Sequence, residues 1–584
     1  MLAPLLIVLA AAPPLPTGYW PPEKSQLLID KTQTIRLAPE LTGLTEAERG
    51  AVAKLLEAGK LFQALYEDQK HSQSRAAEQA LVSLDKRTRS SAGTQNLLTL
   101  YRLNQGPIAE TLDNQREPFL PVAPFVPGKT LYASLKKDEV EAFLTAHPEK
   151  RDELMNLRAV VRRADAASLR NDLATLRKYP VLDTLHPGLS AELTKLSKAK
   201  DPGLYAVPYS VAYAEQLLKA HGLLNEAATL IQKDDPEFAR YLRNRSRDLL
   251  SDDYESGDAA WVTGRFNRLN AQIGAYESYD DDLFGVKSFF SLSLLATRQP
   301  ETTELRKAIK GLQALEDSLP SESHKKVREE IPVGVYDVVA DFGQARGGNT
   351  ATILPDEPYL SRRYGRTILL RSNILRDPLL FEATSKAYAS AVGEEQAKAL
   401  TTDGGFYRTL WHEIGHYLGA DLTRDGRNVA AALQDDASVL EEMKADLVSL
   451  FVAKQLHAQG YYDDAKLKSL RAAGIRRVIL NNKPRRDQPY QTMQLIQWNY
   501  FLEQKLLTFE NGQLRVHEEK YQDTVRGLLK AVLELQLAGD KAAADRFIEK
   551  YTTWDEALHG VVAKNVREQS QYRFRVFKYA AMGE

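Results

Sequence analysis

Two of the ten histidines stand four residues apart in the stretch GGFYRTLWHEIGHYLGAD, residues 404–421. On an α-helix, His412 and His416 would lie one turn apart and only about 40° apart around the axis. Two imidazoles held in this way can both reach one Zn²⁺ ion at about 2.1 Å. Glu413 lies beside them, where it can touch a metal-bound water without becoming a ligand itself. The stretch therefore predicts a helix that presents two metal ligands, although two core histidines sharing a helix face would give the same pattern.

A second helical stretch, DDASVLEEMKADLVSLFVAKQL, begins at Asp435 and offers a second pair of ligand-type residues. Glu442 and Asp446 are again four residues apart, so both lie on one helix face. The Glu442 carboxylate can complete a His₂Glu ligand set, and Asp446 can accept the free imidazole N–H of a ligand histidine. Glu441 can orient the other histidine. The alternative is a solvated helix face, but two successive helices that each offer such a pair favour a metal site.

Both helices also carry end signals in the sequence. Residues able to cap a helix start precede or open each of them, namely Thr401, Thr402 and Asp403 for the first, and Asp435, Asp436 and Ser438 for the second. Gly419 is well placed to end the first helix. The intervening stretch ADLTRDGRNVAAALQ is long enough to let the second helix pack against the first.

The amino-acid composition limits the kinds of functional site and partner that the chain can have. The chain has no cysteine, so disulfides, thiol nucleophiles and cysteine zinc sites are excluded, and any metal must be held by histidine and carboxylate. Its 77 Lys and Arg residues nearly balance its 78 Asp and Glu residues, for a formal net charge of −1. Because nucleic-acid binding normally needs a basic excess on some face, nucleic acid is not expected as a partner.

The N-terminus reads MLAPLLIVLAAAPPLPTGYW, and its residues 2–12 form an apolar run that ends in small residues. This pattern is typical of a secretory signal, so we expect residues 1–20 to be a signal-like leader and the protein to be exported, either periplasmic or secreted. The usual positive charges before the run are missing, and the alternative is an uncleaved tail on a cytoplasmic or membrane-tethered protein. No later segment reaches about 18 uninterrupted apolar residues, so no stable membrane span is expected.

A length of 584 residues implies more than one folding unit. Helical periodicity dominates 21–115, 137–250 and the chain from 378 on. Four prolines between 118 and 127 predict an extended connector. Val, Tyr, Phe and Gly gather in two stretches that we expect to form strands, 258–279 and 331–349. The stretch GRTILLRSNIL at 365–375 is expected to form a further strand.

The element pattern predicts a predominantly helical α+β fold rather than a βαβ alternation. After the leader, we expect an N-terminal helical region with the proline-rich connector (21–130), a mixed helical and β-containing lobe (131–376), and a helical zinc-binding lobe (377–584).

HEIGH at 412–416, followed by EEMKAD at 441–446, resembles the paired motifs of the dipeptidyl peptidase III family of zinc peptidases. The two motifs are specific as a pair. Weaker agreement extends over about residues 200–555, in DDYESGDAAW, YESYDDDLFGVKSFF, ILPDEPYLSRRYGRTILLRSNIL and YFLEQKLL. The resemblance implies two lobes around a wide cleft, with the zinc site on the helical lobe and a small β-containing lobe opposite.

The resemblance also implies roles for individual residues. His412, His416 and Glu442 match the family's zinc ligands, which implies one Zn²⁺ per chain held as in a gluzincin. Glu413 matches the general base. Glu277 and Tyr279 match the family's E-x-Y segment, which contributes to peptide amine binding and carbonyl stabilisation.

Three features depart from the family pattern. The best-known members have one extra residue before the second histidine, whereas this chain keeps the five-residue form and its i, i+4 geometry. The asparagines that hold the substrate's N-terminal end are replaced by Ile353 and Asp356. A downstream histidine that assists the transition state has no counterpart, and the aligned region offers only Tyr490 or Gln491. Release of dipeptides is therefore less firmly implied than zinc hydrolysis.

We therefore expect a zinc metallopeptidase that hydrolyses oligopeptides from their N-terminus, in the manner of a dipeptidyl peptidase. An alternative from another class is a non-catalytic peptide-binding or scaffold protein that keeps the fold. The changed substrate residues favour this alternative, and an intact Glu413 counts against it, because a structural metal site needs no base. A third possibility keeps hydrolysis with a substrate other than peptides. The sequence shows no sign of oligomerisation, so a monomer is expected.

Overall fold

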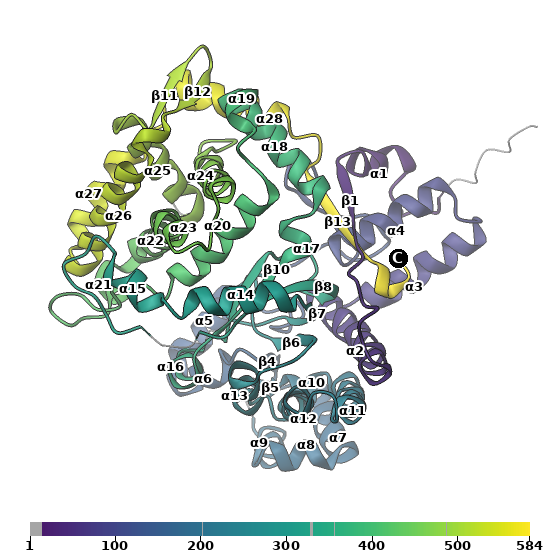
Figure 1. Ribbon diagram of the computed structural model, residues 1–584. Helices are drawn as coiled ribbons and strands as arrows, with labels where there is room; N and C mark the ends of the chain where they lie inside the picture. The colour runs from purple at the N-terminus through teal and green to yellow at the C-terminus, as the bar shows by residue number, and fades with distance from the viewer. Residues whose placement is uncertain (1–14, 201–202, 328–330, 356, 486–487) are drawn as a thin grey trace, which may run out of the picture.

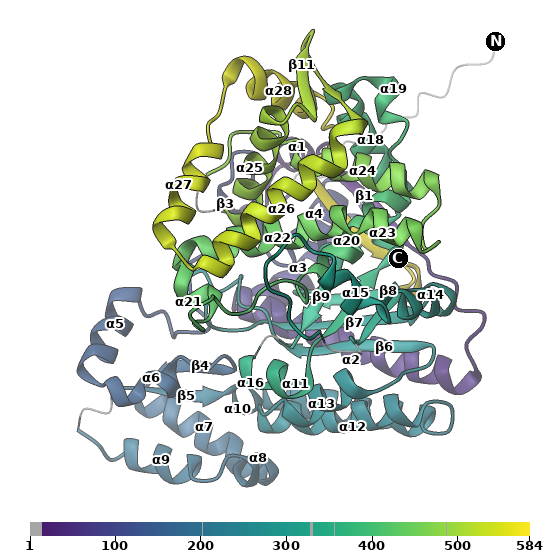
Figure 2. The same ribbon diagram turned by 60° about the vertical axis from the view of Figure 1, so that its left-hand side comes forward.

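The computed structural model describes residues 15–200, 203–327, 331–355, 357–485 and 488–584. Most of the leader expected at 1–20 lies outside these residues, as does Asp356. Two lobes are visible in Figure 1 and Figure 2: a helical lobe from the second half of the chain, and a lobe that contains the main sheet. The expected α+β fold, predominantly helical and two-lobed, is confirmed. Within the described part of the chain, no helix combines the length and apolarity needed to cross a bilayer.

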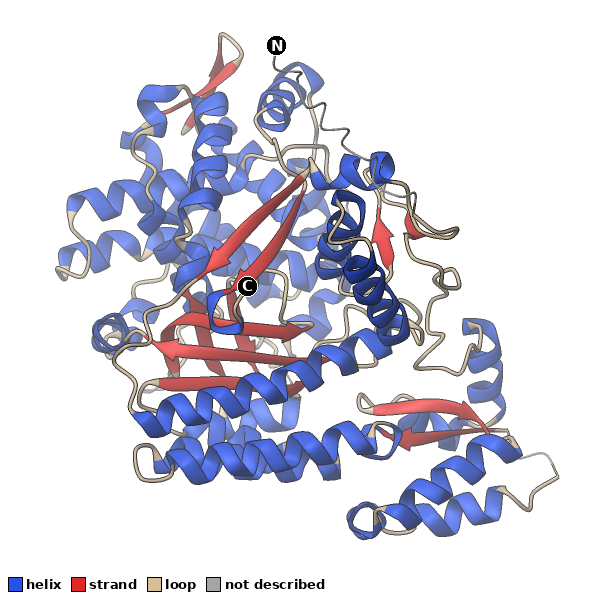
Figure 3. Cartoon of the chain, turned by 90° about the vertical axis from the view of Figure 1, so that its right-hand side faces the viewer, coloured by secondary structure: helices blue, strands red, loops and turns tan. Residues whose placement is uncertain are grey.

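A five-stranded sheet forms the centre of the β-containing lobe (Figure 3). Its order is β6 (Leu269–Ala275), β7 (Phe290–Thr297), β8 (Val333–Gly343), β10 (Thr367–Arg371) and β9 (Ala351–Leu354). Neighbouring strands are antiparallel except β8 and β10, which are parallel. Every residue of β6 and β10 is buried, as expected of strands covered on both faces. The edge strand β9 lies against α20 (Thr402–Gly415), so this edge of the sheet faces the helical lobe.

Long helices pack beneath the sheet. They are α2 (Glu46–Lys70), α11 (Ala214–Ile231) and α12 (Pro236–Ser251). The first packs against β7 and β8, α11 packs against α2, and α12 packs against α11 and β6. A capping box between Thr45 and Glu48 starts α2 and satisfies its first backbone N–H groups.

A smaller helical and β-containing unit follows the proline-rich connector. Its elements are α5 (Lys137–Ala146), α6 (Arg151–Leu154), β4 (Ala159–Arg163), α7 (Ala166–Lys178), α8 (Pro180–Leu185), α9 (Leu189–Leu196), β5 (Leu204–Pro208) and α10 (Tyr209–Ala212). Its two strands pair antiparallel.

The helical lobe is built around α20 and its neighbours. Its elements are α18 (Pro378–Val392), α19 (Glu394–Ala397), α21 (Val429–Leu433), α22 (Ala437–Phe451), α23 (Ala453–Ala458), α24 (Asp464–Val478), α25 (Pro489–Glu503), β11 (Leu507–Glu510), β12 (Gln513–Val516), α26 (Tyr521–Ala538), α27 (Lys541–Tyr551) and α28 (Val561–Glu568). Since α20 packs against both α22 and α24, its residues are held from two sides.

The two ends of the described chain meet. Strand β1 (Thr32–Leu37) pairs in parallel with β13 (Phe574–Tyr579), beside α1 (Pro22–Ile29) and α4 (Ala92–Asn104), as Figure 1 shows. The N-terminal region also contains α3 (Ser74–Arg87), β2 (Ile108–Glu110) and β3 (Arg116–Pro118). The short helices α14 (Gln299–Ile309), α15 (Leu312–Asp317), α16 (Pro358–Tyr364) and α17 (Ser372–Leu375) complete the chain. The hydrophobic core clusters draw on residues from both sides of the domain limits expected at 20, 130 and 376, and those limits stay a prediction.

The strand expected at 258–279 is wrong in its first part, because Glu255–Thr263 form the helix α13. Tertiary contacts stabilise this helix: the Asp258 carboxylate pairs with the buried Arg245 of α12, and Trp261 Nε1 donates to Asn270 Oδ1 at 2.9 Å. The other two expected strands are present as β8 and β10, and the second ends early, where α17 begins.

Candidate metal centre

His412 lies on helix α20, and His416 directly follows the last residue of that helix, as its C-cap. Their rings lie edge to face, with centroids 4.9 Å apart. His412 is 6% exposed and His416 is half-buried. Helix α20 ends at Gly415, one turn before the expected stop at Gly419.

The expected capping bonds do not form at either helix start. Thr401 occupies the N-cap of α20, but its hydroxyl bonds to the Ser469 hydroxyl at 2.7 Å instead of a helix N–H. Asp436 precedes α22 in a helical conformation, and its carboxylate accepts from Lys541 Nζ at 2.8 Å. Both polar groups are used for tertiary contacts between helices.

Glu442 on α22 faces both histidines. Its Oε2 lies 3.2 Å from His412 Nε2 and 3.7 Å from His416 Nε2. One potential ligand atom from each of the three residues lies within 4.8 Å of the other two. The structure thus brings together the three residues that the sequence singled out as metal ligands.

The close contact of α20 with α22 depends on Gly415. A Cβ atom at this position would lie 2.8 Å from the Ala445 carbonyl oxygen and 3.0 Å from Ala445 Cα. Both of these atoms belong to the backbone of α22, which cannot move aside as a side chain can. The missing side chain therefore lets the two helices approach at the level of the ligand residues.

A carboxylate holds the second nitrogen of each imidazole. His412 Nδ1 lies 2.8 Å from Asp446 Oδ1, and His416 Nδ1 lies 2.9 Å from Glu441 Oε1. With Nδ1 donating to these acids, each Nε2 is left as a lone-pair donor that points toward Glu442. Asp446 and Glu441 thus each lie beside one of the histidines, as the sequence predicted.

Two arginines surround Asp446, and sequence reasoning missed them. Arg408 Nη1 donates to Asp446 Oδ1 at 2.7 Å, and Arg477 Nε lies 3.5 Å from Asp446 Oδ2. Although burial alone raises the pKa of Asp446, these arginines and His412 hold it well below its usual range. Arg408 stands four residues before His412 on the same helix face, a spacing that could have indicated it. Arg477 comes from α24, and no local pattern points to it.

Glu441 is held in a similar way. Lys444 Nζ lies 2.8 Å from Glu441 Oε1, and Gln536 Nε2 donates to Glu441 Oε2 at 3.2 Å. Burial opposes ionisation here too, but Lys444 and His416 hold the pKa of Glu441 well below its usual range. The carboxylate that orients His416 is therefore ionised at neutral pH.

The donor set fits a divalent cation. Glu442 Oε2 is buried and accepts no well-formed hydrogen bond, although it faces two imidazoles. Two imidazole nitrogens and one carboxylate are the ligands of many catalytic zinc sites, where a further position stays open. Burial lowers the pKa of His412, but Asp446 and Glu442 outweigh it and raise that pKa to about 9. Because zinc binds neutral imidazole, it has to displace this proton.

The metal group opens into a cavity of about 490 Å³ between the lobes. The helical lobe lines it with Glu413, His416, Glu441, Glu442 and Tyr490, and the β-containing lobe lines it with Glu277, Tyr279, Asn349, Ala351, Thr352, Ile353 and Arg366. Glu277 and Tyr279 thus share one cavity with the metal group, and the Tyr279 side chain is 71% exposed. Burial raises the pKa of Glu413 above its ordinary value, which suits a group that takes up and releases a proton.

Tyr490 lies at the metal group, in the region where the sequence offered no histidine. Its hydroxyl donates to Glu442 Oε1 at 3.0 Å. Gln491 is not among the residues that line the cavity. Asn349, which sequence reasoning missed, lines the cavity two residues before β9, and Ile353 lines it from β9 itself.

Solved structures share this fold. The structure of dipeptidyl peptidase III from Caldithrix abyssi superposes with a TM-score of 0.78 at 24% identity, covering 96% of this chain and 99% of that one. Dipeptidyl-peptidase III from Corallococcus sp. strain EGB superposes with a TM-score of 0.72 at 24% identity, covering 96% of this chain and 98% of that one. The chain therefore has the fold of these two proteins over nearly its whole length.

Among curated proteins, Nudix hydrolase 3 of Arabidopsis thaliana is 28% identical over 372 residues. The match covers 62% of this chain and 48% of the plant protein, so the chain spans about half the length of this relative. No family model matches the sequence.

Proposed function

We propose that this chain is a zinc-dependent peptidase that hydrolyses oligopeptides in the cavity between its lobes, from the N-terminal end, as a dipeptidyl peptidase does. The observation that carries this proposal is the convergence of His412, His416 and Glu442, of which His416 and Glu442 line a cavity that Glu413 also lines. The fold shared with two dipeptidyl peptidases III supports it.

One Zn²⁺ ion would be held by His412 Nε2, His416 Nε2 and a Glu442 carboxylate oxygen. When bound, zinc polarises a peptide carbonyl and lowers the pKa of a coordinated water from 15.7 toward roughly 7. Asp446 and Glu441 keep both imidazoles turned with Nε2 toward this point, because each accepts the opposite ring N–H.

Glu413 is assigned the role of general base. It takes the proton of the attacking water and delivers it to the leaving amine. The raised pKa of Glu413 lies closer to neutral pH, which suits both proton transfers. The Tyr279 and Tyr490 hydroxyls, one from each lobe, are assigned to the carbonyl oxygen as negative charge develops on it. Tyr490 would turn its proton from Glu442 Oε1 to that oxygen.

Two residues of the β-containing lobe favour a free peptide N-terminus. The Glu277 carboxylate is assigned to the substrate's α-ammonium group, and the Asn349 side chain offers an amide in the same cavity. Ile353 supplies an apolar side chain where the resemblance implies an asparagine, so Asn349 is the amide that remains on this wall.

A non-catalytic peptide-binding protein is the second candidate. Ile353 favours it, because a hydrophobic residue replaces a substrate-holding amide. The retained Glu413 counts against it, because a half-buried carboxylate with a raised pKa beside the ligand histidines has no structural task there.

Purified protein should contain about one zinc per chain and cleave a mixture of oligopeptides, with products identified by mass. Removing zinc with a chelator should abolish cleavage, and adding zinc back should restore it. Glu413→Gln should keep the zinc and lose about 10²–10⁴-fold in rate. Glu382→Gln, an exposed change on α18 that breaks a pair with Lys386, is the matched control and should cleave as the wild type does.

The products separate the two candidates. Dipeptides from free but not from N-acetylated peptides support the full proposal. Zinc binding and peptide binding without cleavage would leave the non-catalytic protein. Cleavage that persists in Glu413→Gln contradicts the assigned base.

We also propose that the protein is exported and acts as a monomer. The apolar run at residues 2–12 supports export. N-terminal sequencing of protein recovered outside the cytoplasm should show that the leader has been removed, and light scattering should give the mass of one chain. Cytoplasmic protein that retains Met1 would contradict export.

A further inference from the structure

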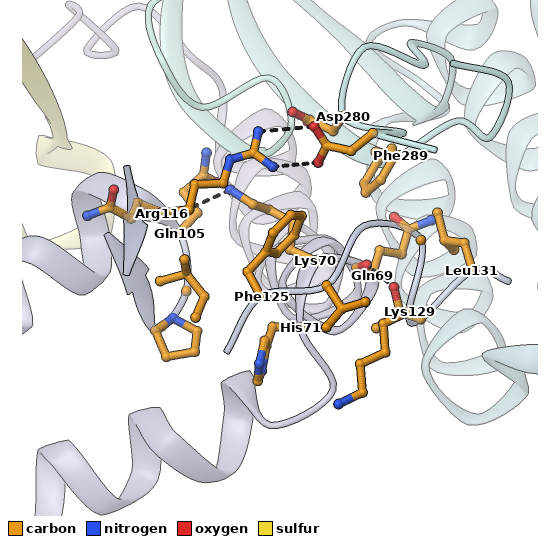
Figure 4. A pocket seen from close by; sticks show the side chains of 18 of the residues that line it. Gln69, Lys70, His71, Gln105, Arg116, Phe125, Lys129, Leu131, Asp280 and Phe289 are labelled. Carbon is orange, nitrogen blue, oxygen red and sulfur yellow. Dashed lines mark hydrogen bonds and ion pairs between the residues drawn. The ribbon is translucent and has the colours of Figure 1, made fainter. Parts of the chain in front are cut away.

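A second cavity, of about 270 Å³, lies between the N-terminal helices and the loop that joins β6 to β7 (Figure 4). Its walls come from the end of α2, the turn between α4 and β2, the connector around residues 125–131, and the acidic residues 280–282. We call it the N-terminal pocket. No residue lines both this pocket and the metal cavity among those that the structure describes.

The acidic residues of the pocket are already paired within the protein. Asp280 Oδ2 accepts from the Tyr66 hydroxyl and from Gln344 Nε2, each at 2.9 Å. Arg116 forms two parallel bonds to Asp282, at 2.8 and 3.0 Å.

Asp281 is also fully occupied. It accepts from the Tyr132 hydroxyl at 2.7 Å and from the backbone N–H groups of residues 283, 284, 286 and 287. These bonds shape the loop and leave the three acids little capacity to hold a cation.

The Lys70 ammonium group, in contrast to these acids, has hydrogen-bonding capacity left. Its Nζ donates to the Asn104 carbonyl oxygen at 3.0 Å, and within the described residues it forms no ion pair with a carboxylate. Burial lowers the pKa of Lys70, and the charges of Asp280 and Asp282 offset this only in part. An ammonium group with unused N–H donors inside a pocket favours an anionic ligand.

Part of the pocket wall is apolar. Phe125, Val126 and Phe289 line the pocket, and the Arg116 guanidinium lies over the Phe125 ring, with 4.6 Å from Cζ to the centroid. Figure 4 shows Phe125 and Arg116 next to Lys70, while Lys129 extends away from them. A cationic group beside an apolar patch is the pattern of a small-molecule site that fixes a charged end and buries a hydrophobic one.

We propose that the N-terminal pocket binds a small organic carboxylate with an apolar side group, of the size of an N-acylated amino acid. The carboxylate lies on Lys70 Nζ, and the apolar group packs against Phe125 and Phe289. The loop that supplies Asp280 and Asp282 to this pocket also carries Glu277 and Tyr279 to the metal cavity. A bound ligand therefore restrains a loop that the two cavities share.

Titration calorimetry on the full protein as purified tests this with N-acetyl-L-phenylalanine, its amide, and inorganic phosphate. The acid should bind at least about tenfold more tightly than the amide, because the amide lacks the charge that pairs with Lys70. Phosphate should bind more weakly than the acid, because it has no apolar part. Hydrogen exchange should slow on addition of the acid in the segments around residues 69–71 and 280–289.

Variants locate the site. Lys70→Met should weaken binding of the acid by about tenfold or more, while Lys129→Met in the same pocket and the distant surface change Lys219→Met should stay within about threefold. Val126→Asp places a carboxylate at a residue that is 48% exposed, where folding is not at risk, and should also weaken binding.

Equal binding of acid and amide would overturn the proposal, and so would tighter binding of phosphate than of the acid. Unchanged affinity in a folded Lys70→Met, or unchanged affinity in Val126→Asp, would place the ligand elsewhere and overturn it too. Because none of these measurements depends on peptide cleavage, their failure is distinguishable from failure of the proposed peptidase.

Discussion

Replacing Asp446 with asparagine tests how the outer carboxylates control the metal centre. The side chain is 3% exposed and accepts from His412 Nδ1 at 2.8 Å and from Arg408 Nη1 at 2.7 Å. Asparagine keeps the shape, but its NH₂ group meets hydrogen-bond donors on every side and its charge is gone. His412 then loses the partner that holds its Nε2 toward Glu442.

The expected losses differ for metal binding and for folding. Loss of such a partner typically costs 10–100-fold in metal affinity, or about 1.4–2.7 kcal/mol. Removing one member of a buried ion pair typically costs about 3–5 kcal/mol of folding stability. The loss of folding stability in Asp446→Asn should fall near the lower end of this range, because the Arg408 and Arg477 side chains are 13% and 26% exposed and water reaches them.

Zinc affinity is measured by competition with a chromophoric chelator, and stability by urea unfolding of the metal-free protein. Glu441→Gln makes the same change beside His416, at a side chain that is 38% exposed, and should cost about tenfold in affinity. In Arg408→Gln/Asp446→Asn one of the two arginine charges that Asp446 balanced is gone as well, so stability should partly recover while zinc affinity stays low. A folded Asp446→Asn that binds zinc as tightly as the wild type refutes the assigned role.

Three further predictions concern the same centre. In metal-free protein the pKa of His412 is raised from 6.5 to about 9, so its stabilising effect is complete below pH 6.5 and is lost as the pH rises through 9. The difference in unfolding free energy between wild type and His412→Gln, measured in chelator, should therefore shrink from pH 6 to pH 10, and a constant difference would contradict this. Tyr490→Phe should lower kcat/KM by about 10²-fold while zinc affinity stays within about threefold, and unchanged kinetics would remove Tyr490 from the reaction. Gly415→Ala should destabilise the fold by about 1–3 kcal/mol and weaken zinc binding, because its Cβ meets the backbone of α22. Gly405→Ala on the same helix is the control and should do neither, because its Cβ meets nothing within 4 Å. Equal stability of the two variants would contradict the close approach of the two helices.

The candidate ligands could be found from the sequence because helical spacing is local. Four residues separate His412 from His416 and Glu442 from Asp446, and any α-helix places such pairs on one face. That these two faces would meet required only that two neighbouring helices pack. The paired motifs then gave the two-lobed fold by resemblance, which the solved structures bear out.

The contacts that sequence reasoning missed come from distant parts of the chain. Arg477 reaches Asp446 from α24, and strand β13 joins β1 across more than five hundred residues. The strand prediction failed at helix α13 because its Trp and Val residues favour a strand, whereas the buried pair of Asp258 with Arg245 holds it beside α12. Asn349 follows two glycines and belongs to no periodic pattern, so only the folded cavity reveals it.

The proposed peptidase activity depends on one zinc ion shared by His412, His416 and Glu442. A crystal of the protein with zinc, measured on both sides of the zinc absorption edge, shows the ion directly in an anomalous difference map. We predict one strong peak per chain, bonded to both Nε2 atoms and to a Glu442 oxygen. A map without a peak there, from protein that still cleaves peptides, would contradict the account.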